Sequence, residues 1–388
     1  MPIPSHPSFA YYAAQQRQWR SHKCYATATC NYFNIIYTSG TTGKPKGCPF
    51  TNRNIITNAI NGLNCFSKGI GKRIEDLRQM ITVPLFHVTG SHTQMNMALM
   101  GATSVVLLEF KAAECIDAMI EEKINFFVGV TAMLLLMRVQ PNYPKLVELG
   151  LLEGMGQGGS PLPPDLGEAV LEDFPKMRFI NVFGLTETTS IAAASFLPPD
   201  EIIERGSAVG VPIGPTKYKI VDEQLHEVPE GQPGELVISG AGVCKEYWNA
   251  PEKTKEAFFT GEEGRRWLRT GDIAVVDDKG LYNIVGRLKD MIVRGGENVY
   301  CVELENLVFM DYRVSQAGVA GVPDEVLGEK IKAVIFPKPE QTVTADEIKD
   351  YCRERIAEYK VPDYVVITDR PLPVNPGGKL IKPELKKM

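Results

Sequence analysis

The stretch Tyr37-Thr-Ser-Gly-Thr-Thr-Gly-Lys-Pro-Lys-Gly47 decides how this sequence is interpreted. It follows an apolar run, Phe33–Tyr37, that is typical of a strand. Its glycines free backbone N–H groups, and its hydroxyl and ammonium groups add donors, so the segment suits phosphate oxygens. The P-loop pattern G-x-x-x-x-G-K-[ST] does not fit it. A plain polar loop is the alternative, but the density of donors favours a phosphate-binding loop after a strand.

Length and composition indicate a soluble globular protein of two or three domains. The chain has 388 residues, 44% hydrophobic and 23% charged. Its eight cysteines are scattered and form no C-x-x-C pair, which favours reduced, mostly buried thiols in the cytoplasm. No apolar run reaches the roughly 18–20 residues of a membrane span.

The charge is unevenly distributed along the chain. The net charge is −5, yet nine Lys and Arg residues precede the first acidic residue, Glu75. The basic N-terminal segment is consistent with a mitochondrial targeting peptide or with the surroundings of an anion site. We expect no nucleic-acid partner, because the chain is acidic overall and no basic stripe alternates with aromatic residues.

Short apolar runs alternate with amphipathic stretches over the first half of the chain. The predicted strands are Phe33–Tyr37, Met80–Val83, Ser104–Leu108, Phe126–Val130 and Arg178–Phe183. The predicted helices are Ala112–Lys123, Leu134–Val139 and Pro164–Asp173. This alternation predicts an α/β fold with crossover helices and parallel strands.

The pattern changes twice further along the chain. From Gly206 to Val285, short strands separated by Gly and Pro turns predict a β-rich subdomain. In the last hundred residues, Ile331–Phe336 is predicted as a strand and Ala345–Ala357 as a helix. We therefore predict a poorly defined lead-in over residues 1–30, a large domain over 31–288, and a small, mobile α+β domain over 289–388.

Further motifs follow the glycine-rich segment in a fixed order. They are Pro84-Leu-Phe-His87, Gly156-Gln-Gly-Gly-Ser-Pro161, Asn181-Val-Phe-Gly-Leu-Thr-Glu-Thr188, Gly234–Trp248, Trp267-Leu-Arg-Thr-Gly-Asp272, Gly286–Asn298, Glu358–Pro362 and Asn375-Pro-Gly-Gly-Lys379. Together with Tyr37–Gly47 the set resembles the adenylate-forming superfamily of acyl-CoA ligases, peptide-synthetase adenylation domains and luciferases. The resemblance covers roughly residues 31–388 and is nearest to acyl-CoA ligases.

The resemblance implies ATP, Mg²⁺ and CoA as cofactor and co-substrates, and it implies roles for particular residues. Lys379 would be the catalytic cation that bridges the carboxylate and the α-phosphate. Glu187 would hold magnesium. His87 would line the acyl pocket or thiol tunnel, the alternative being a core histidine. The ATP or AMP site would comprise Thr38, Ser39, Gly40, Thr41, Thr42, Gly43, Lys46, Gly158, Gly159, Ser160, Phe183, Gly184, Thr186, Asp272 and Arg287.

The resemblance also implies a two-state mechanism with a rotating C-terminal domain. Lys289 stands at the hinge position, a solvated surface lysine being the alternative. Gly295, Gly296 and Glu297 would form the CoA-side loop. Asp272 would accept hydrogen bonds from the ribose hydroxyls, and Phe183 would stack on adenine, where the family more often has tyrosine.

The main departure from the family is at the N-terminus. Only 36 residues precede Tyr37, whereas family members carry a much longer region there that contributes to the acyl pocket. A fragment and a natural truncation are both consistent with this. Exposed apolar surface is an expected consequence.

These observations predict an AMP-forming ligase that converts a carboxylic acid, ATP and CoA to acyl-CoA, AMP and pyrophosphate through an acyl-adenylate. A fatty or other apolar acid is preferred over an aryl acid, and a homodimer is possible. A carrier-protein-loading adenylation domain, a luciferase-type oxidase and an inactive nucleotide-binding remnant are the alternatives.

Overall fold

The computed structural model describes residues 9–12, 32–38, 45–70, 76–129, 131–158, 164–198, 201, 205, 208–374 and 380–388. The chain folds into two compact units. Unit 1 comprises Met1–Lys219, Val237–Thr270 and Asp277–Asn283, and unit 2 comprises Ile220–Leu236, Gly271–Val276 and Ile284–Met388. Each unit is described by itself.

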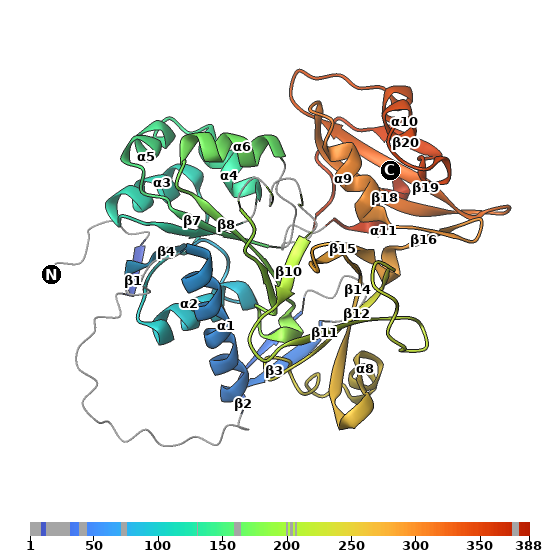
Figure 1. Ribbon diagram of the computed structural model, residues 1–388. Helices are drawn as coiled ribbons and strands as arrows, with labels where there is room; N and C mark the ends of the chain where they lie inside the picture. The colour runs from blue at the N-terminus through green and yellow to red at the C-terminus, as the bar shows by residue number, and fades with distance from the viewer. Residues whose placement is uncertain are drawn as a thin grey trace. The chain divides into compact units, whose positions relative to one another are not determined.

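A parallel sheet forms the centre of unit 1 (Figure 1). Its strands are β4 (Arg78–Ile81), β5 (Thr103–Leu107), β6 (Phe126–Val128), β7 (Gly154–Gln157) and β8 (Arg178–Phe183), in the order β5-β4-β6-β7-β8. All four neighbouring pairs are parallel. Antiparallel strands flank them: β1 (Phe9–Tyr12) pairs with β5, and β9 (Ala193–Ser195) and β10 (Ala208–Pro212) follow β8.

Helices cover both faces of this sheet, as Figure 1 shows. They are α1 (Asn52–Ile70), α2 (Val88–Met100), α3 (Ala112–Glu121), α4 (Thr131–Arg138), α5 (Tyr143–Leu149) and α6 (Pro164–Asp173). Successive strand residues point to opposite faces. Accordingly, the fully buried Phe126 packs in a cluster with Phe66 of α1, whereas Phe127 packs with residues of α3 to α6 such as Met119 and Leu146. The predicted parallel sheet with crossover helices is confirmed.

A β-rich segment follows, with residues in both units. Its elements are β11 (Lys217–Val221), β12 (Gly234–Ser239), α8 (Pro251–Ala257), β13 (Phe258–Thr260), β14 (Arg266–Val276) and β15 (Tyr282–Arg287). In hydrogen-bonding order, β15, β14, β12 and β11 come after β10, and β13 pairs with β14. The predicted β-rich subdomain is confirmed.

Unit 2 has a core of its own around a five-stranded sheet. The elements are β16 (Ile292–Arg294), β17 (Glu297–Val299), α9 (Cys301–Phe309), β18 (Val314–Asp324), β19 (Gly328–Pro337), α10 (Ala345–Arg353), β20 (Tyr364–Ile367) and α11 (Lys382–Lys387). Ile335 of β19 packs with Leu304 of α9 and Ile348 of α10, whereas the adjacent Val334 packs with Leu385 of α11. Helices therefore cover both faces of this sheet as well.

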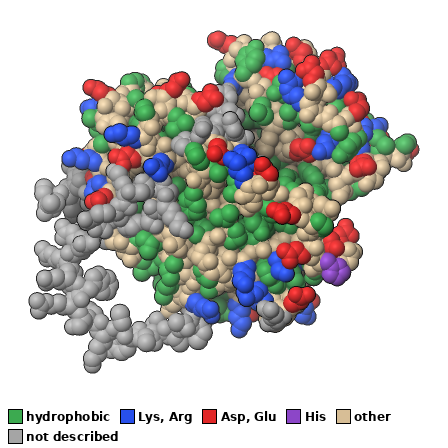
Figure 2. All heavy atoms as spheres, in the orientation of Figure 1, with side chains coloured by type: hydrophobic (Ala, Val, Ile, Leu, Met, Phe, Trp, Pro, Cys, Tyr) green, Lys and Arg blue, Asp and Glu red, His purple; other side chains and the backbone are tan. Residues whose placement is uncertain are grey.

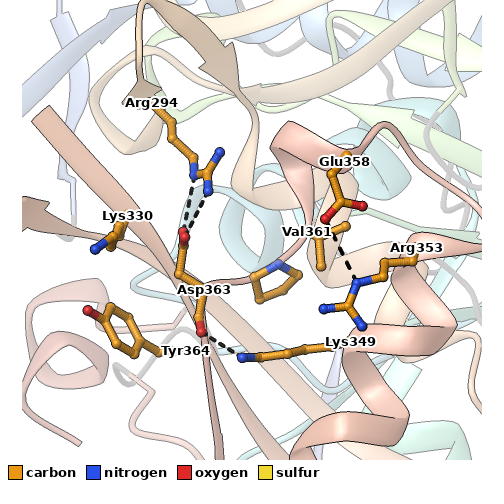
Figure 3. A pocket seen from close by; sticks show the side chains of 9 residues that line it. Arg294, Lys330, Lys349, Arg353, Glu358, Val361, Asp363 and Tyr364 are labelled. Atoms are coloured by element: carbon orange, nitrogen blue, oxygen red, sulfur yellow. Dashed lines mark hydrogen bonds and ion pairs between the residues drawn. The ribbon is translucent and has the colours of Figure 1, made fainter. Parts of the chain in front are cut away.

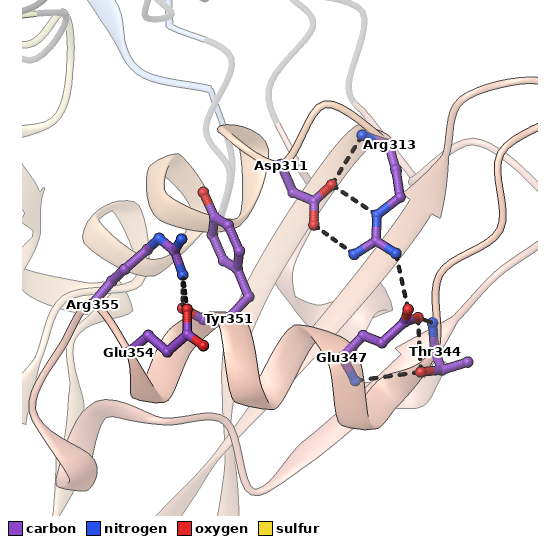
Figure 4. A network of polar contacts seen from close by, with 7 residues as sticks. All are labelled: Asp311, Arg313, Thr344, Glu347, Tyr351, Glu354 and Arg355. Carbon is purple, nitrogen blue, oxygen red and sulfur yellow. Dashed lines mark hydrogen bonds and ion pairs between the residues drawn. The ribbon is translucent and has the colours of Figure 1, made fainter.

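A polar network fastens the start of α10 to the turn before β18 (Figure 4). Arg313 donates to both carboxylate oxygens of the buried Asp311, at 3.0 and 2.9 Å, and to Glu347 at 3.1 Å. The hydrogen bonds from Arg313 hold the pKa of Asp311 below its ordinary value, although burial opposes the shift. Thr344 and Glu347 complete a capping box at the helix N-terminus.

The structure corrects two predictions about local elements. The predicted strand Phe33–Tyr37 exists as β2 (Tyr32–Tyr37), but it pairs antiparallel with β3 (Gly47–Thr51) in a separate two-stranded sheet. The helix predicted over Ala345–Ala357 ends at Arg353, because the chain turns after Glu354 toward Pro362. Six cysteines in the described part of the chain are buried, as predicted.

Among the described residues, no helix is both long and apolar enough to cross a membrane. On the face shown in Figure 2, Lys and Arg side chains are interspersed with Asp and Glu side chains.

Helix α2 contains a buried histidine that predicts a pH dependence of stability. His92 is 1% exposed, and burial lowers its pKa from 6.5 to about 4, although Thr189 O accepts from its ring at 3.4 Å. The unfolded chain therefore binds a proton that the folded chain excludes between about pH 6.5 and 4. The free energy of unfolding should fall across this range by on the order of 2–3 kcal/mol from His92 alone.

Urea unfolding between pH 7 and 4.5 checks this prediction. His92→Gln removes the titration and should flatten the acid-side slope. His226→Gln, at a side chain that is 80% exposed, is the control for replacing a histidine outside the core. Equal slopes for the wild type and His92→Gln would contradict the assignment.

Candidate functional site

The glycine-rich segment connects two antiparallel strands, and hydrogen bonds close its base. Tyr37 ends β2 and Gly47 begins β3, and the two residues are register partners. Thr38 N–H donates to Lys46 O at 2.9 Å, and Lys46 N–H donates to the Thr38 hydroxyl at 3.3 Å. The structure therefore places Thr38 and Lys46 opposite each other.

The carboxyl ends of β7 and β8 meet at one edge of the parallel sheet. Gly158 follows β7, and a Cβ there would lie 2.7 Å from Val182 O on β8. Gly184 follows Phe183, and a Cβ there would lie 1.3 Å from Ser190 O. Both positions therefore need glycine. Ligands of open parallel sheets bind at such edges, which agrees with the predicted nucleotide-side role of these residues.

Glu187 lies in a tight turn directly after β8. The 3₁₀-helix Thr186–Thr188 follows Leu185, whose N–H donates to the Thr188 hydroxyl at 2.8 Å. Thr189 adopts a left-handed conformation (φ 61°), and its hydroxyl donates to Gly242 O at 2.5 Å. The turn therefore holds Thr186 and Glu187 in a fixed orientation at the sheet edge.

Asparagine side chains of α1 hold the backbone that follows this turn. The side-chain amides of Asn58 and Asn61 donate to Ile191 O at 3.3 and 3.1 Å. Asn54 donates to Ala241 O at 2.8 Å and to Val243 O at 3.2 Å. One helix thus holds both the segment after Glu187 and the segment before Tyr247.

Lys46 and Glu187 both form hydrogen bonds with the Tyr247 hydroxyl. Lys46 Nζ donates to the Tyr247 hydroxyl at 3.0 Å, and that hydroxyl donates to Glu187 Oε1 at 2.6 Å. Tyr247 is 4% exposed. Burial, and then the charge and hydrogen bond of Glu187, raise the pKa of Tyr247 far above its ordinary value. The hydroxyl therefore stays protonated.

Sequence interpretation missed Tyr247, although it quoted the block Gly234–Trp248 without assigning a role. The residues that Tyr247 contacts lie 201 and 60 positions away. The available signal was the pair of adjacent aromatic residues Tyr247 and Trp248. Only the fold shows which residues the Tyr247 hydroxyl contacts.

Asp272 and Arg287 lie together in unit 2. Asp272 on β14 is 3% exposed, and Arg287 Nε donates to its Oδ1 at 2.7 Å. The structure thus joins Asp272, which is predicted to hold the ribose, to Arg287, which is predicted to hold the ribose or phosphate. Their contact with a nucleotide stays a prediction.

The predicted hinge and CoA-side loop also lie in unit 2. Lys289 is exposed in the 3₁₀-helix Leu288–Asp290. Gly295 and Gly296 have φ values of 61° and 88° and connect β16 to β17, with Arg294 opposite Glu297. Two consecutive positive φ angles are typical of a type I′ hairpin, so both glycines are needed for the turn.

A solvent-open hollow of about 360 Å³ lies beside this hairpin in unit 2 (Figure 3). Its cations are Arg294, Lys330, Lys349 and Arg353, and its acids are Glu358 and Asp363. Arg294 donates to both oxygens of Asp363, at 2.8 and 3.1 Å. Although burial opposes it, the hydrogen bonds from Arg294 and from Ile331 N–H lower the pKa of Asp363. The lining therefore carries more positive than negative charge.

The remaining predicted residues divide into two groups. His87 is exposed and begins α2 as its N-cap, where Nδ1 accepts from Thr89 N–H at 3.2 Å. This capping contact is the side-chain role that the geometry supports, and its part in an acyl pocket stays a prediction. Outside the described residues lie Ser39, Gly40, Thr41, Thr42, Gly43, Gly159, Ser160 and Lys379.

Two family models match this chain. The model of the AMP-binding enzyme family matches residues 10–248, and that of the AMP-binding enzyme C-terminal domain matches residues 303–379.

Individual proteins of this kind are similar over most of the chain. The mitochondrial medium-chain acyl-CoA ligase ACSF2 of Mus musculus is 35% identical over 357 residues, 91% of this chain and 57% of that protein. Feruloyl-CoA synthase of an Amycolatopsis species is 34% identical over 356 residues, 91% of this chain and 69% of that protein. This chain therefore spans little more than half the length of the medium-chain ligase.

Solved structures agree with the sequence matches. The o-succinylbenzoate CoA synthetase of Bacillus subtilis, in complex with its acyl-adenylate intermediate, superimposes with a TM-score of 0.76 at 30% identity, covering 91% of this chain and 68% of that one. Since the first family model spans more than half of the residues, this chain belongs to the AMP-binding enzyme family.

Proposed function

We propose that this chain is an ATP-dependent acyl-CoA ligase, which joins a carboxylic acid to CoA through an acyl-adenylate and releases AMP and pyrophosphate. The observation that carries the proposal is the meeting of Lys46 and Glu187 at the Tyr247 hydroxyl. A cation from the glycine-rich segment thereby lies near a carboxylate, and in this proposal the cation would bind phosphate and the carboxylate would hold Mg²⁺.

The chemistry of adenylation explains these residue types. The carboxylate attacks the α-phosphate, so two anions approach and positive charge is needed in the transition state. Thr38 and Lys46 would contact the triphosphate, and Lys379 would bridge the α-phosphate and the carboxylate. Asp272 and Arg287 would hold the ribose, with Phe183 against the adenine.

Glu187 fits a magnesium ion that is shared with ATP. Mg²⁺ bound with a nucleotide takes one or two protein carboxylates, while phosphates and waters complete its shell. Among the described residues, no cluster of three or more His, Cys, Asp or Glu side chains would hold a metal by itself. A single carboxylate beside the glycine-rich segment therefore suits Mg²⁺ held jointly with phosphate. When bound, the ion would neutralise charge on the triphosphate.

The CoA step is proposed for unit 2. The Gly295–Glu297 hairpin begins at Arg294, which also lines the cationic hollow. CoA carries phosphate groups, and Arg and Lys side chains bind phosphate by charge-assisted hydrogen bonds. Lys289 would be the residue at which the chain rotates between the two steps.

An apolar carboxylic acid is the proposed substrate class. The similar proteins include a medium-chain acyl-CoA ligase and a feruloyl-CoA synthase. The first name supports an aliphatic acid and the second an aromatic acid, so the exchange panel decides between these classes.

Carboxylate-dependent ATP–pyrophosphate exchange tests the proposal on this 388-residue chain. A panel of short, long and aromatic acids should give exchange, highest with an apolar acid. Glu187→Gln should reduce the rate at least ~100-fold, because the metal loses its carboxylate. Glu256→Gln, at an exposed ion pair of α8, is the control. Bound ATP without exchange for any acid would instead indicate an inactive nucleotide-binding remnant.

Lys379→Ala should separate the two half-reactions. Adenylate formation should be lost because the α-phosphate loses its cation, whereas CoA transfer from a supplied acyl-adenylate should continue. Lys387→Ala, an exposed lysine of α11, should change neither step. Equal loss of both steps in Lys379→Ala would contradict the role.

Arg353→Ala should weaken CoA binding. Removal of one charge-assisted contact should raise the KM for CoA about 10-fold while leaving pyrophosphate exchange unchanged. Arg355→Ala is the matched control, since this nearby arginine lies over the Tyr351 ring and outside the hollow. The same KM for both variants and the wild type would exclude the hollow as a CoA site.

A further inference from the structure

The segment from Cys244 to Trp248 connects the turn that carries Glu187 to the start of β3, next to Lys46. Cys244 N–H donates to Glu187 O at 2.8 Å, and Trp248 N–H donates to Gly47 O at 2.8 Å. The segment is therefore fastened to the residue that would hold magnesium and to the residue that follows Lys46.

Tyr247 is held inside this segment from several sides. Its N–H donates to the Thr254 hydroxyl at 3.0 Å, and its ring packs edge-on against Phe258 with the centroids 5.8 Å apart. Lys46 Nζ lies 4.3 Å from the ring centroid as well as 3.0 Å from the hydroxyl. The ring has little freedom to move, so its hydroxyl marks a fixed point.

The direction of the two hydrogen bonds follows from the proton count. A neutral tyrosine has one proton to donate and can also accept. Glu187 as a carboxylate only accepts, and the Lys46 ammonium only donates. The Tyr247 hydroxyl therefore donates to Glu187 and accepts from Lys46, and it sits between a cation and an anion that attract each other.

We propose that Tyr247 is a positioning residue that keeps Lys46 and Glu187 one hydroxyl apart, so that the ammonium faces the triphosphate and the carboxylate faces its magnesium ion. This inference rests on the proposed function. Without the hydroxyl, Lys46 and Glu187 would pair directly in a partly buried place where screening is weak. Mg·ATP would then have to break that pair before it bound.

Tyr247→Phe tests the inference, because it removes one oxygen and keeps the ring. The Kd of Mg·ATP, measured by calorimetry, should rise about 10- to 100-fold, as expected for the loss of a hydrogen bond to a charged group. The KM for Mg·ATP in pyrophosphate exchange should rise in parallel, with a smaller change in kcat. CoA transfer from a supplied acyl-adenylate should be retained.

Tyr143→Phe is the matched control. It removes a buried hydroxyl that donates to Asp173 at 2.8 Å, between α5 and α6. Both variants should lose similar thermal stability, whereas only Tyr247→Phe should weaken Mg·ATP binding. A purely structural role would move both variants alike, and an unchanged Mg·ATP Kd in Tyr247→Phe would overturn the proposal.

A double-mutant cycle with Lys46→Met gives a second readout. If Tyr247 acts through Lys46, Tyr247→Phe should raise the Mg·ATP Kd less in the Lys46→Met background than in the wild type. Equal effects in the two backgrounds would overturn the spacer role. Wild-type binding of Mg·ATP without exchange for any acid would reject the ligase function alone, since the Kd comparison still stands. No wild-type binding of Mg·ATP would reject both.

Discussion

The common direction of β4 to β8 is the constraint on which unit 1 depends. Because β7 and β8 are parallel, the segments that leave their carboxyl ends reach the same edge of the sheet, and Gly158 and Glu187 follow from there. A parallel sheet also needs a helix between strands, and the opposite directions of Phe126 and Phe127 require helices on both faces. The crossover helices thus form the core, and the carboxyl ends of the strands carry the candidate site residues.

A small set of buried polar contacts turns that edge into a defined arrangement. Helix α1 holds Ile191 O through Asn58 and Asn61, and it holds the backbone near Tyr247 through Asn54. The same helix therefore holds the segments that carry Glu187 and Tyr247. Buried polar groups are costly when unpaired, so these asparagines favour one arrangement of the two segments over others.

Unit 2 is built around a smaller sheet, in which most strand pairs are antiparallel. Its sheet is covered on both faces, and its turn at Gly295–Gly296 has two left-handed residues. Arg294 joins this turn to Asp363 through two hydrogen bonds, so the hairpin and the cationic hollow form one structural feature. Under the proposed function, unit 2 carries residues of both steps: Asp272, Arg287 and Lys379 for adenylation, and the Gly295–Glu297 hairpin for the CoA step.

The sequence by itself determined the features that depend on neighbouring residues. These include the alternation that predicts the parallel strands, the bounds of helix Pro164–Asp173, and the glycine-rich segment with its donors. Only the tertiary structure decided that β2 pairs with β3 outside the main sheet and that Tyr247 separates Lys46 from Glu187. Periodicity and turn chemistry act over a few residues. The contacts of Tyr247 join residues 60 and 201 positions apart, and packing of the whole unit sets them.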